Sequence, residues 1–229
     1  MKNNSEKWSH PASCIFAGSS GVGKTELALN LVRHQHFSSP IENVFYFGCI
    51  GNESANKLNW HKILKDVCVT YSEGLPGTSF FSRIPENSLV VIDDQFEDAV
   101  NSKEISRAYK VDRRHSKFSI ILITQSLFEH GKYDKAIRNN CEIFCLFKNY
   151  GDITSHTEFS RRLGVKKYYE EWLQDAENVK HAYIVINNSS NIPDENLRMS
   201  TNLFGELKKF GEFPVYPPNH QRTNHLVNI

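Results

Sequence analysis

The chain has 229 residues, of which 39% are hydrophobic and 12% aromatic, enough for one sizeable α/β core. Its formal net charge of +1 excludes a global attraction to DNA or to an anionic membrane, so any contact with nucleic acid must be local. The opening MKNNSEKWSHP is polar and unlike a secretory signal, and no apolar run approaches the roughly 18 residues of a membrane span. We therefore expect an intracellular protein that is not secreted.

Six apolar runs are expected to form buried strands, because they are rich in Val, Ile, Phe and Tyr and lack polar alternation. They cover residues 13–18, 43–48, 88–94, 119–125, 142–149 and 182–187. Helix-like segments lie at 24–35, 56–67, 102–115, 133–140, 156–163 and 166–177. This alternation predicts an α/β fold with a doubly wound, mostly parallel sheet flanked by helices. A single domain is expected over residues 1–203, followed by a C-terminal tail over 204–229 that is mobile or docks a partner.

The cysteines and two histidines give no sign of a metal site or a disulfide framework. The five cysteines, Cys14, Cys49, Cys68, Cys141 and Cys145, show no CxxC spacing, so buried reduced thiols are expected. His34 and His36 lack a nearby cysteine or acidic cluster, and a surface position at a helix end is expected for both.

Residues 18–25 read GSSGVGKT and match the pattern G-x-x-x-x-G-K-[ST], between an apolar strand and a helix-forming segment. The backbone N–H groups of such a loop surround nucleotide phosphates at the positive end of the following helix. Lys24 is expected to bridge the β- and γ-phosphates, and the Thr25 hydroxyl to ligate Mg²⁺. The residues assigned to ATP binding are Gly18, Ser19, Ser20, Gly21, Val22, Gly23, Lys24 and Thr25.

An acidic pair ends the run SLVVIDD at residues 88–94. A strand through the core delivers these carboxylates to the edge of the sheet where the sites of α/β proteins lie. Asp93 is expected to hold Mg²⁺ through water, and Asp94 to orient and deprotonate the attacking water. Glu97, beyond the strand, is an alternative base.

The run SIILITQ at 119–125 is a second apolar strand, and its polar end, Gln125, can sense the γ-phosphate. An acidic pair plus a polar strand end is typical of hydrolysing motors whose sensor strand lies between the two nucleotide-binding strands. Small-molecule kinases usually carry an Arg-rich lid instead, and no compact Arg-rich, Gly-flanked segment is present in the sequence. The motifs therefore predict a P-loop NTPase that hydrolyses ATP.

The block RRHSKFSIILITQSLFEHGKYDKAIRNNCEIFCLFKN at 113–149 resembles the packaging ATPases of poxvirus-like and other DNA viruses and of related virus-like transposons. These proteins belong to the FtsK/HerA superfamily. The upstream AGSSGVGKT and VVIDD agree with the family in order and rough spacing, so that the resemblance covers residues 12 to about 150. It implies a RecA/FtsK-like fold of the additional-strand class and a ring-forming ATPase that drives a viral genome into a preformed capsid.

The resemblance also implies partners and a location. The partners are double-stranded DNA, a capsid or portal-vertex protein, and further copies of the chain in a homo-oligomeric ring. The location is the host nucleus or cytoplasm, or the virion.

Carried over by residue, the resemblance assigns Lys24 and Thr25 to the phosphate and metal, and Asp93 to Mg²⁺. It assigns Asp94 to the catalytic carboxylate and Gln125 to the sensor. Many motors of this superfamily have Glu after the metal-binding Asp, so Asp94 is a departure. Its shorter side chain needs a water or a closer approach.

A hydrolysing ring also needs an arginine from the neighbouring subunit, because charge accumulates on the γ-oxygens. Arg113, Arg114 and Arg138 are the candidates, with Arg138 or Arg114 favoured. Exposed basic residues on solvated helix ends are the alternative for each.

Three basic stretches could grip the DNA backbone without reading bases: 113–117, 129–135 and 161–169. The last includes Tyr168 and Tyr169, which could stack on bases. Ordinary solvated helix faces are the alternative.

Three other functions stay open at this point. A nucleotide or nucleoside kinase has the right size and the same loop. A viral superfamily-3 helicase usually has Asn at the sensor position and a further domain before the phosphate loop, which here starts at residue 18. A nucleotide-gated scaffold would bind nucleotide and barely hydrolyse it.

Overall fold

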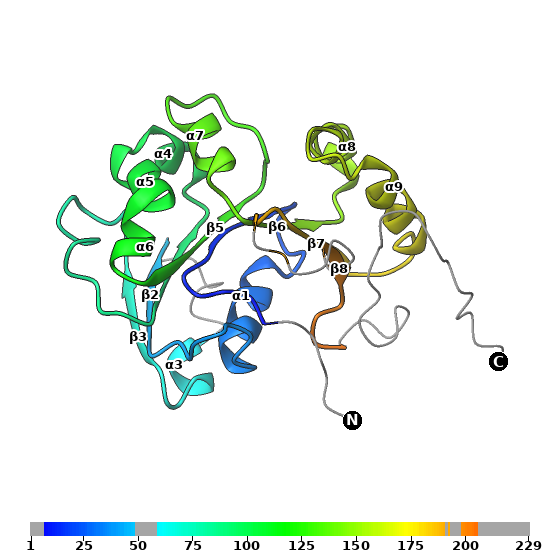
Figure 1. The fold of residues 1–229 in the computed structure, drawn as a ribbon. Helices are drawn as coiled ribbons and strands as arrows, with labels where there is room; N and C mark the ends of the chain where they lie inside the picture. The colour runs from blue at the N-terminus through cyan, green and yellow to red at the C-terminus, as the bar shows by residue number, and fades with distance from the viewer. Residues whose placement is uncertain (1–6, 49–58, 191, 193–197, 206–229) are drawn as a thin grey trace.

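A central sheet organises the chain in the computed structural model, which describes residues 7–48, 59–190, 192 and 198–205. Within these residues eight strands pair in the order β3-β2-β4-β5-β1-β6-β7-β8 (Figure 1). Their bounds are β1 Ser13–Ala17, β2 Asn43–Phe47, β3 Cys68–Ser72, β4 Ser88–Asp93, β5 Phe118–Thr124, β6 Ile143–Phe147, β7 Tyr183–Asn187 and β8 Met199–Thr201. The strands from β3 across the sheet to β6 are mutually parallel, and β7 and β8 each run antiparallel to the strand before them. The predicted mostly parallel sheet is thus confirmed.

The position of β5 decides where the functional segments meet. It lies between β1 and β4, with Ala17 opposite Thr124 and Asp93 opposite Ile123. Because these strands are parallel, the phosphate loop, the acidic pair and Gln125 leave the sheet at one edge. This is the arrangement expected of the additional-strand class.

Helices cover both faces of the sheet (Figure 1). Helices α1 (Lys24–Arg33) and α3 (Trp60–Ile63) lie on one face. The other face carries α4 (Phe96–Asn101), α5 (Lys103–Arg107), α6 (Arg113–His115), α7 (Asp134–Asn139), α8 (Ile153–Arg162) and α9 (Lys166–Asp175). The described residues also form two short helical turns: π-helical Ala108–Asp112 between α5 and α6, and 3₁₀-helical Tyr150–Asp152 before α8.

Successive residues of β1 belong to two separate cores. Ile15 and Ala17 pack under α4 to α9, whereas Cys14 and Phe16 pack against α1. Since both faces are covered, every residue of β1, β5 and β6 is buried. That double burial explains why these strands are unbroken apolar runs in the sequence.

Several elements differ from expectation. The edge strand β3 is absent from the sequence-based prediction, because its residues CVTYS are partly or fully exposed and form no apolar run. Of the helix predicted over 56–67, the described part retains Trp60–Ile63 alone. The predicted helix 102–115 contains a π-helical turn, and β8, with three residues, is too short to show a periodicity.

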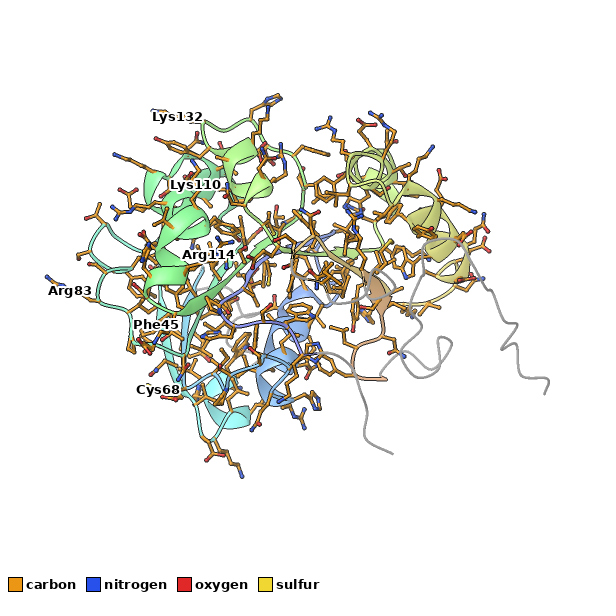
Figure 2. All side chains as sticks on the ribbon, in the orientation of Figure 1. Phe45, Cys68, Arg83, Lys110, Arg114 and Lys132 are labelled. Atoms are coloured by element: carbon orange, nitrogen blue, oxygen red, sulfur yellow. The ribbon has the colours of Figure 1, made fainter. Side chains whose placement is uncertain are left out.

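The predicted environments of His36 and Cys68 were wrong. His36 is buried, with its ring 5.5 Å from Trp8 and 5.4 Å from Phe204 between ring centroids, so it does not lie on the surface. Cys68 is exposed on the edge strand β3 (Figure 2), while Cys14, Cys141 and Cys145 are buried free thiols as expected. Cys49 lies outside the described residues.

The last described residues lie beside α1. Phe204 stacks on His34 with ring centroids 4.8 Å apart, and Leu203 is buried. The rest of the predicted tail lies outside the described residues, so the domain boundary stays a prediction. No helix in the described ranges is long and apolar enough to span a bilayer.

Candidate active site

The phosphate loop occupies the gap between β1, which ends at Ala17, and α1, which begins at Lys24. Gly23 has φ of 101° and ψ of 14°, a left-handed conformation that an L side chain rarely adopts. At Gly18 a side chain would place its Cβ 2.7 Å from the Cβ of Phe147. The motif glycines therefore meet requirements of backbone conformation and of close approach.

The Lys24 side chain folds back onto the start of this loop. Its Nζ donates to the carbonyl oxygens of Gly18 at 2.6 Å and Ser19 at 2.7 Å. Burial lowers the pKa of Lys24, and the charges of Asp93 and Asp94 oppose that shift. A phosphate oxygen offers this ammonium a stronger, charge-assisted partner than two carbonyls.

Thr25 and Asp93, the predicted ligands of Mg²⁺, are in direct contact. The Thr25 hydroxyl donates to Oδ2 of Asp93 at 2.8 Å, and the Tyr46 hydroxyl donates to the same oxygen at 2.5 Å. Burial raises the pKa of Asp93, against the opposing effects of both hydroxyls and of Lys24. Hydroxyl and carboxylate oxygens are the donors that Mg²⁺ prefers, so the residues present fit this cation.

Asp94, the residue after Asp93, contacts Gln125, the predicted sensor. Its φ of 57° is left-handed, a conformation in which Asp and Asn are enriched. The Gln125 side chain donates from Nε2 to Oδ1 of Asp94 at 3.0 Å, and both residues are exposed. The half-buried carboxylate of Asp93 thus contacts Thr25, while the exposed carboxylate of Asp94 contacts Gln125. Glu97, the alternative base, is exposed in the first turn of α4.

Two residues of this site were missed from the sequence. Tyr46 comes from the neighbouring strand β2, and its polar hydroxyl near the end of an apolar strand was the signal that could have found it. His181 lies just before β7, with Nδ1 3.1 Å from the carbonyl oxygen of Val22. No motif marks His181, because the contact joins residues 159 positions apart.

Comparison with known proteins adds evidence on the fold. No family model and no curated protein matches the chain. Among solved structures it is similar to the genome packaging NTPase B204 from Sulfolobus turreted icosahedral virus 2. For the sulfate complex the identity is 13% over 92% of this chain and 98% of that chain, with a TM-score of 0.53. For the ATP-gammaS complex it is 11% over 91% and 98%, also with 0.53.

The chain is likewise similar to B204, the DNA-packaging ATPase from Sulfolobus turreted icosahedral virus. The identity is 13% over 92% of this chain and 100% of that chain, with a TM-score of 0.51. This chain has the fold of a P-loop NTPase. At such low identity the likeness concerns the fold.

The candidate arginines of this P-loop NTPase fold differ sharply in environment. The Arg113 side chain is 2% exposed and donates to Glu142 Oε1 at 2.5 Å and to the Pro11 carbonyl at 3.0 Å. That burial contradicts a role for Arg113 in a neighbouring subunit's site. Arg114 is 67% exposed and pairs with the same Glu142 oxygen at 3.2 Å.

Arg138 lies beneath the segment that follows Gln125. It forms an ion pair with Asp134, donates to the Leu127 carbonyl at 3.2 Å, and places its guanidinium 4.7 Å from the centre of the Phe128 ring. Its side chain is 13% exposed. A finger role for Arg138 stays a prediction, one that requires it to leave Asp134.

The basic stretches lie on different elements. Figure 2 shows Lys132 in the loop before α7 and Arg114 on α6, both in the helical layer opposite α1. On α8, Arg161 and Arg162 both pair with Glu158. Tyr169 on α9 is fully buried against Trp172, so its predicted stacking on bases is wrong.

No cluster suited to a structural metal accompanies this site. Across the described parts of the chain, no three His, Cys, Asp or Glu side chains gather in a metal-binding group. The hydroxyl of Thr25 and the carboxylate of Asp93 stay the predicted ligands of Mg²⁺, and they lie in hydrogen-bond contact.

Proposed function

We propose that this chain is an ATP-hydrolysing double-stranded DNA translocase that packages a viral genome into a preformed capsid. The observation that carries the hydrolytic part is the contact of Gln125 with Asp94, beside the Thr25–Asp93 pair and next to the phosphate loop. The predicted sensor amide, an exposed carboxylate and the two predicted Mg²⁺ ligands thereby lie at one edge of the sheet, which supports the proposal.

The chain's own groups divide the work of hydrolysis. Backbone N–H groups of residues 18–25 and the Lys24 ammonium hold the phosphates, while Thr25 and Asp93 would hold Mg²⁺. Mg²⁺, when bound, supplies charge neutralisation on the phosphate oxygens. Lys24 is buried and Asp93 is half-buried, and at such positions a charge interacts more strongly with a phosphate or a cation than it does in water.

Asp94 acts on the attacking water in this proposal. Its carboxylate accepts a proton as the water oxygen bonds to the γ-phosphorus and the bond to the bridging oxygen of ADP breaks. Gln125 holds the Asp94 carboxylate by its amide N–H and leaves its amide oxygen to orient the water. A base held in this way typically contributes about 10²- to 10⁴-fold in rate.

The packaging role is supported by the resemblance of residues 113–149 and by the likeness to the packaging NTPase B204 over nearly its whole length. In this proposal the chain acts in a homo-oligomeric ring at a capsid or portal-vertex protein. Arg114 or Arg138 of each subunit completes the site of the next. DNA contacts come from the exposed basic residues of the stretches at 113–117, 129–135 and 161–169.

The test is the rate of ATP hydrolysis with and without long double-stranded DNA, using Lys24→Ala as the control. We expect DNA to raise the rate, the Lys24 variant to abolish it, and added salt to weaken the stimulation, because phosphate contacts are salt-sensitive. A rate of ATP consumption that is unchanged by DNA and raised by a nucleoside acceptor would establish the kinase alternative instead.

A further inference from the structure

Tyr46 lies where the sheet meets the cation site. It belongs to β2, which pairs with β4 so that Tyr46 lies opposite Val91, two residues before Asp93. The side chain is 4% exposed, and its hydroxyl donates to Oδ2 of Asp93 at 2.5 Å. No part of the nucleotide-binding motifs includes this residue.

Packing fixes the direction of the Tyr46 ring. Its centroid lies 5.6 Å from the Trp60 ring and 5.8 Å from the Tyr71 ring, on α3 and β3. At Gly48 an added Cβ would lie 3.1 Å from the Tyr46 ring and 3.3 Å from the Asp93 carbonyl oxygen. The ring is thus closely surrounded, and its hydroxyl can serve as a rigid support.

Oδ2 of Asp93 accepts hydrogen bonds from two hydroxyls that are held by different parts of the fold. Thr25 is in the first turn of α1, at the end of the phosphate loop, whereas Tyr46 is held within the sheet. A Thr25 hydroxyl that ligates a cation uses a lone pair, keeps its O–H and can still donate to Asp93, but its position then follows the cation and the phosphate loop. The Tyr46 hydroxyl donates to the same oxygen from the sheet, independently of the loop, and so can fix the orientation of the carboxylate.

We propose that Tyr46 is a positioning residue: its hydroxyl holds the Asp93 carboxylate in the orientation that binds the Mg²⁺ of the nucleotide. The inference deepens the proposed function and rests on it. The role parallels that of hydrogen-bond donors behind ligating carboxylates in metal sites generally, whose loss typically costs about 10- to 100-fold in metal affinity.

Tyr46→Phe removes the hydroxyl and keeps the ring. The measurement is calorimetric binding of ATP-gammaS with and without saturating Mg²⁺, which gives the factor by which Mg²⁺ tightens binding. We expect Tyr46→Phe to reduce this factor about tenfold and to leave metal-free affinity within about twofold. Tyr71→Phe is the matched control, since this neighbouring tyrosine packs on Tyr46 and should leave the factor unchanged.

A double-mutant cycle separates positioning from loss of fold. If Tyr46 acts through Asp93, then Tyr46→Phe should have no further effect on the Mg²⁺ factor in an Asp93→Asn background. An equal reduction in both backgrounds would show a general structural effect and overturn the inference. This part of the cycle compares Asp93→Asn with the double variant that also carries Tyr46→Phe. The comparison therefore stays decisive even if Tyr46→Phe lowers the melting temperature.

The failure of the inference and of the proposed function are distinguishable. If Mg²⁺ tightens ATP-gammaS binding by the same factor in Tyr46→Phe as in the wild type, the inference is overturned and the ATPase proposal stays intact. A wild-type chain that binds no ATP-gammaS in either condition overturns both.

Discussion

The side chain of Gln125, at the end of β5, donates a hydrogen bond to Oδ1 of Asp94, the residue that follows β4. The two side chains come from adjacent parallel strands and are 31 residues apart in the chain. Asp93 is half-buried at the end of β4, whereas Asp94 has a left-handed backbone and an exposed side chain. A single contact therefore ties the predicted sensor to the predicted base.

Asp94→Asn should abolish hydrolysis and preserve nucleotide binding. Asn tolerates the left-handed backbone and keeps an oxygen for Gln125, yet cannot accept the proton. We expect the rate to fall by about 10²-fold or more, with ATP-gammaS affinity within a few-fold of wild type. Single-turnover hydrolysis and calorimetric binding check the two halves. Asp94→Asn that hydrolyses normally would remove Asp94 from the role of base and turn attention to Glu97.

Much of this site follows from the sequence because it depends on local order. A loop after one buried strand and polar residues at the ends of two others must meet where parallel strands end. One edge of the sheet accordingly carries the five predicted residues Lys24, Thr25, Asp93, Asp94 and Gln125. The covered sheet itself follows from the same apolar runs.

What the sequence could not predict depends on contacts between distant segments. The bonds of Tyr46 to Asp93 and of His181 to Val22 span 47 and 159 residues, and no spacing rule links such pairs. Arg113 and Arg114 are identical neighbours, yet one is 2% and the other 67% exposed. Only the packing of α6 on the sheet distinguishes them.

This difference predicts unequal effects on stability. Arg113→Ala removes a buried guanidinium that bonds Glu142 and the Pro11 carbonyl, and should lower the free energy of unfolding by about 1.5–3 kcal/mol. Arg114→Ala removes an exposed ion pair and should cost less than about 1 kcal/mol. Urea unfolding of both variants measures the contrast. Equal losses would contradict the assignment of the buried position to Arg113.

Subunit mixing tests which arginine acts in trans. Arg114→Ala and Asp94→Asn subunits are each expected to be inactive alone in the ring. Mixed, they create interfaces that pair an intact Arg114 with an intact Asp94, so part of the activity should return. The same mixture made with Arg138→Ala shows whether that residue acts in trans instead. A mixture that stays inactive for both variants excludes both residues as fingers.

Mild acid should destabilise the fold through two buried histidines. Burial lowers the pKa of His36 and of His156 to about 4, from an ordinary value of 6.5. The unfolded chain therefore takes up protons first, and the free energy of unfolding should be constant above pH 6.5 and decline as the pH drops toward 4. The effect can reach about 3 kcal/mol for each histidine.

Melting temperatures recorded from about pH 8 to pH 4 check this slope. His156→Leu should flatten part of it, because this side chain is fully buried and its ring nitrogens have no hydrogen-bond partner among the residues that the structure describes. His115→Leu, at an exposed position on α6, serves as the control and should leave the profile unchanged. An unaltered slope in His156→Leu would contradict the assignment.

The central claim is ATP-driven movement along double-stranded DNA, and displacement of a triplex-forming third strand measures it most directly. A translocase that reaches the triplex strips the labelled strand, and the delay before release grows with the distance it travels. We predict release that requires ATP, a delay that lengthens with the duplex track, and no release by Asp94→Asn. Hydrolysis without any release, on tracks of every length, would contradict the account.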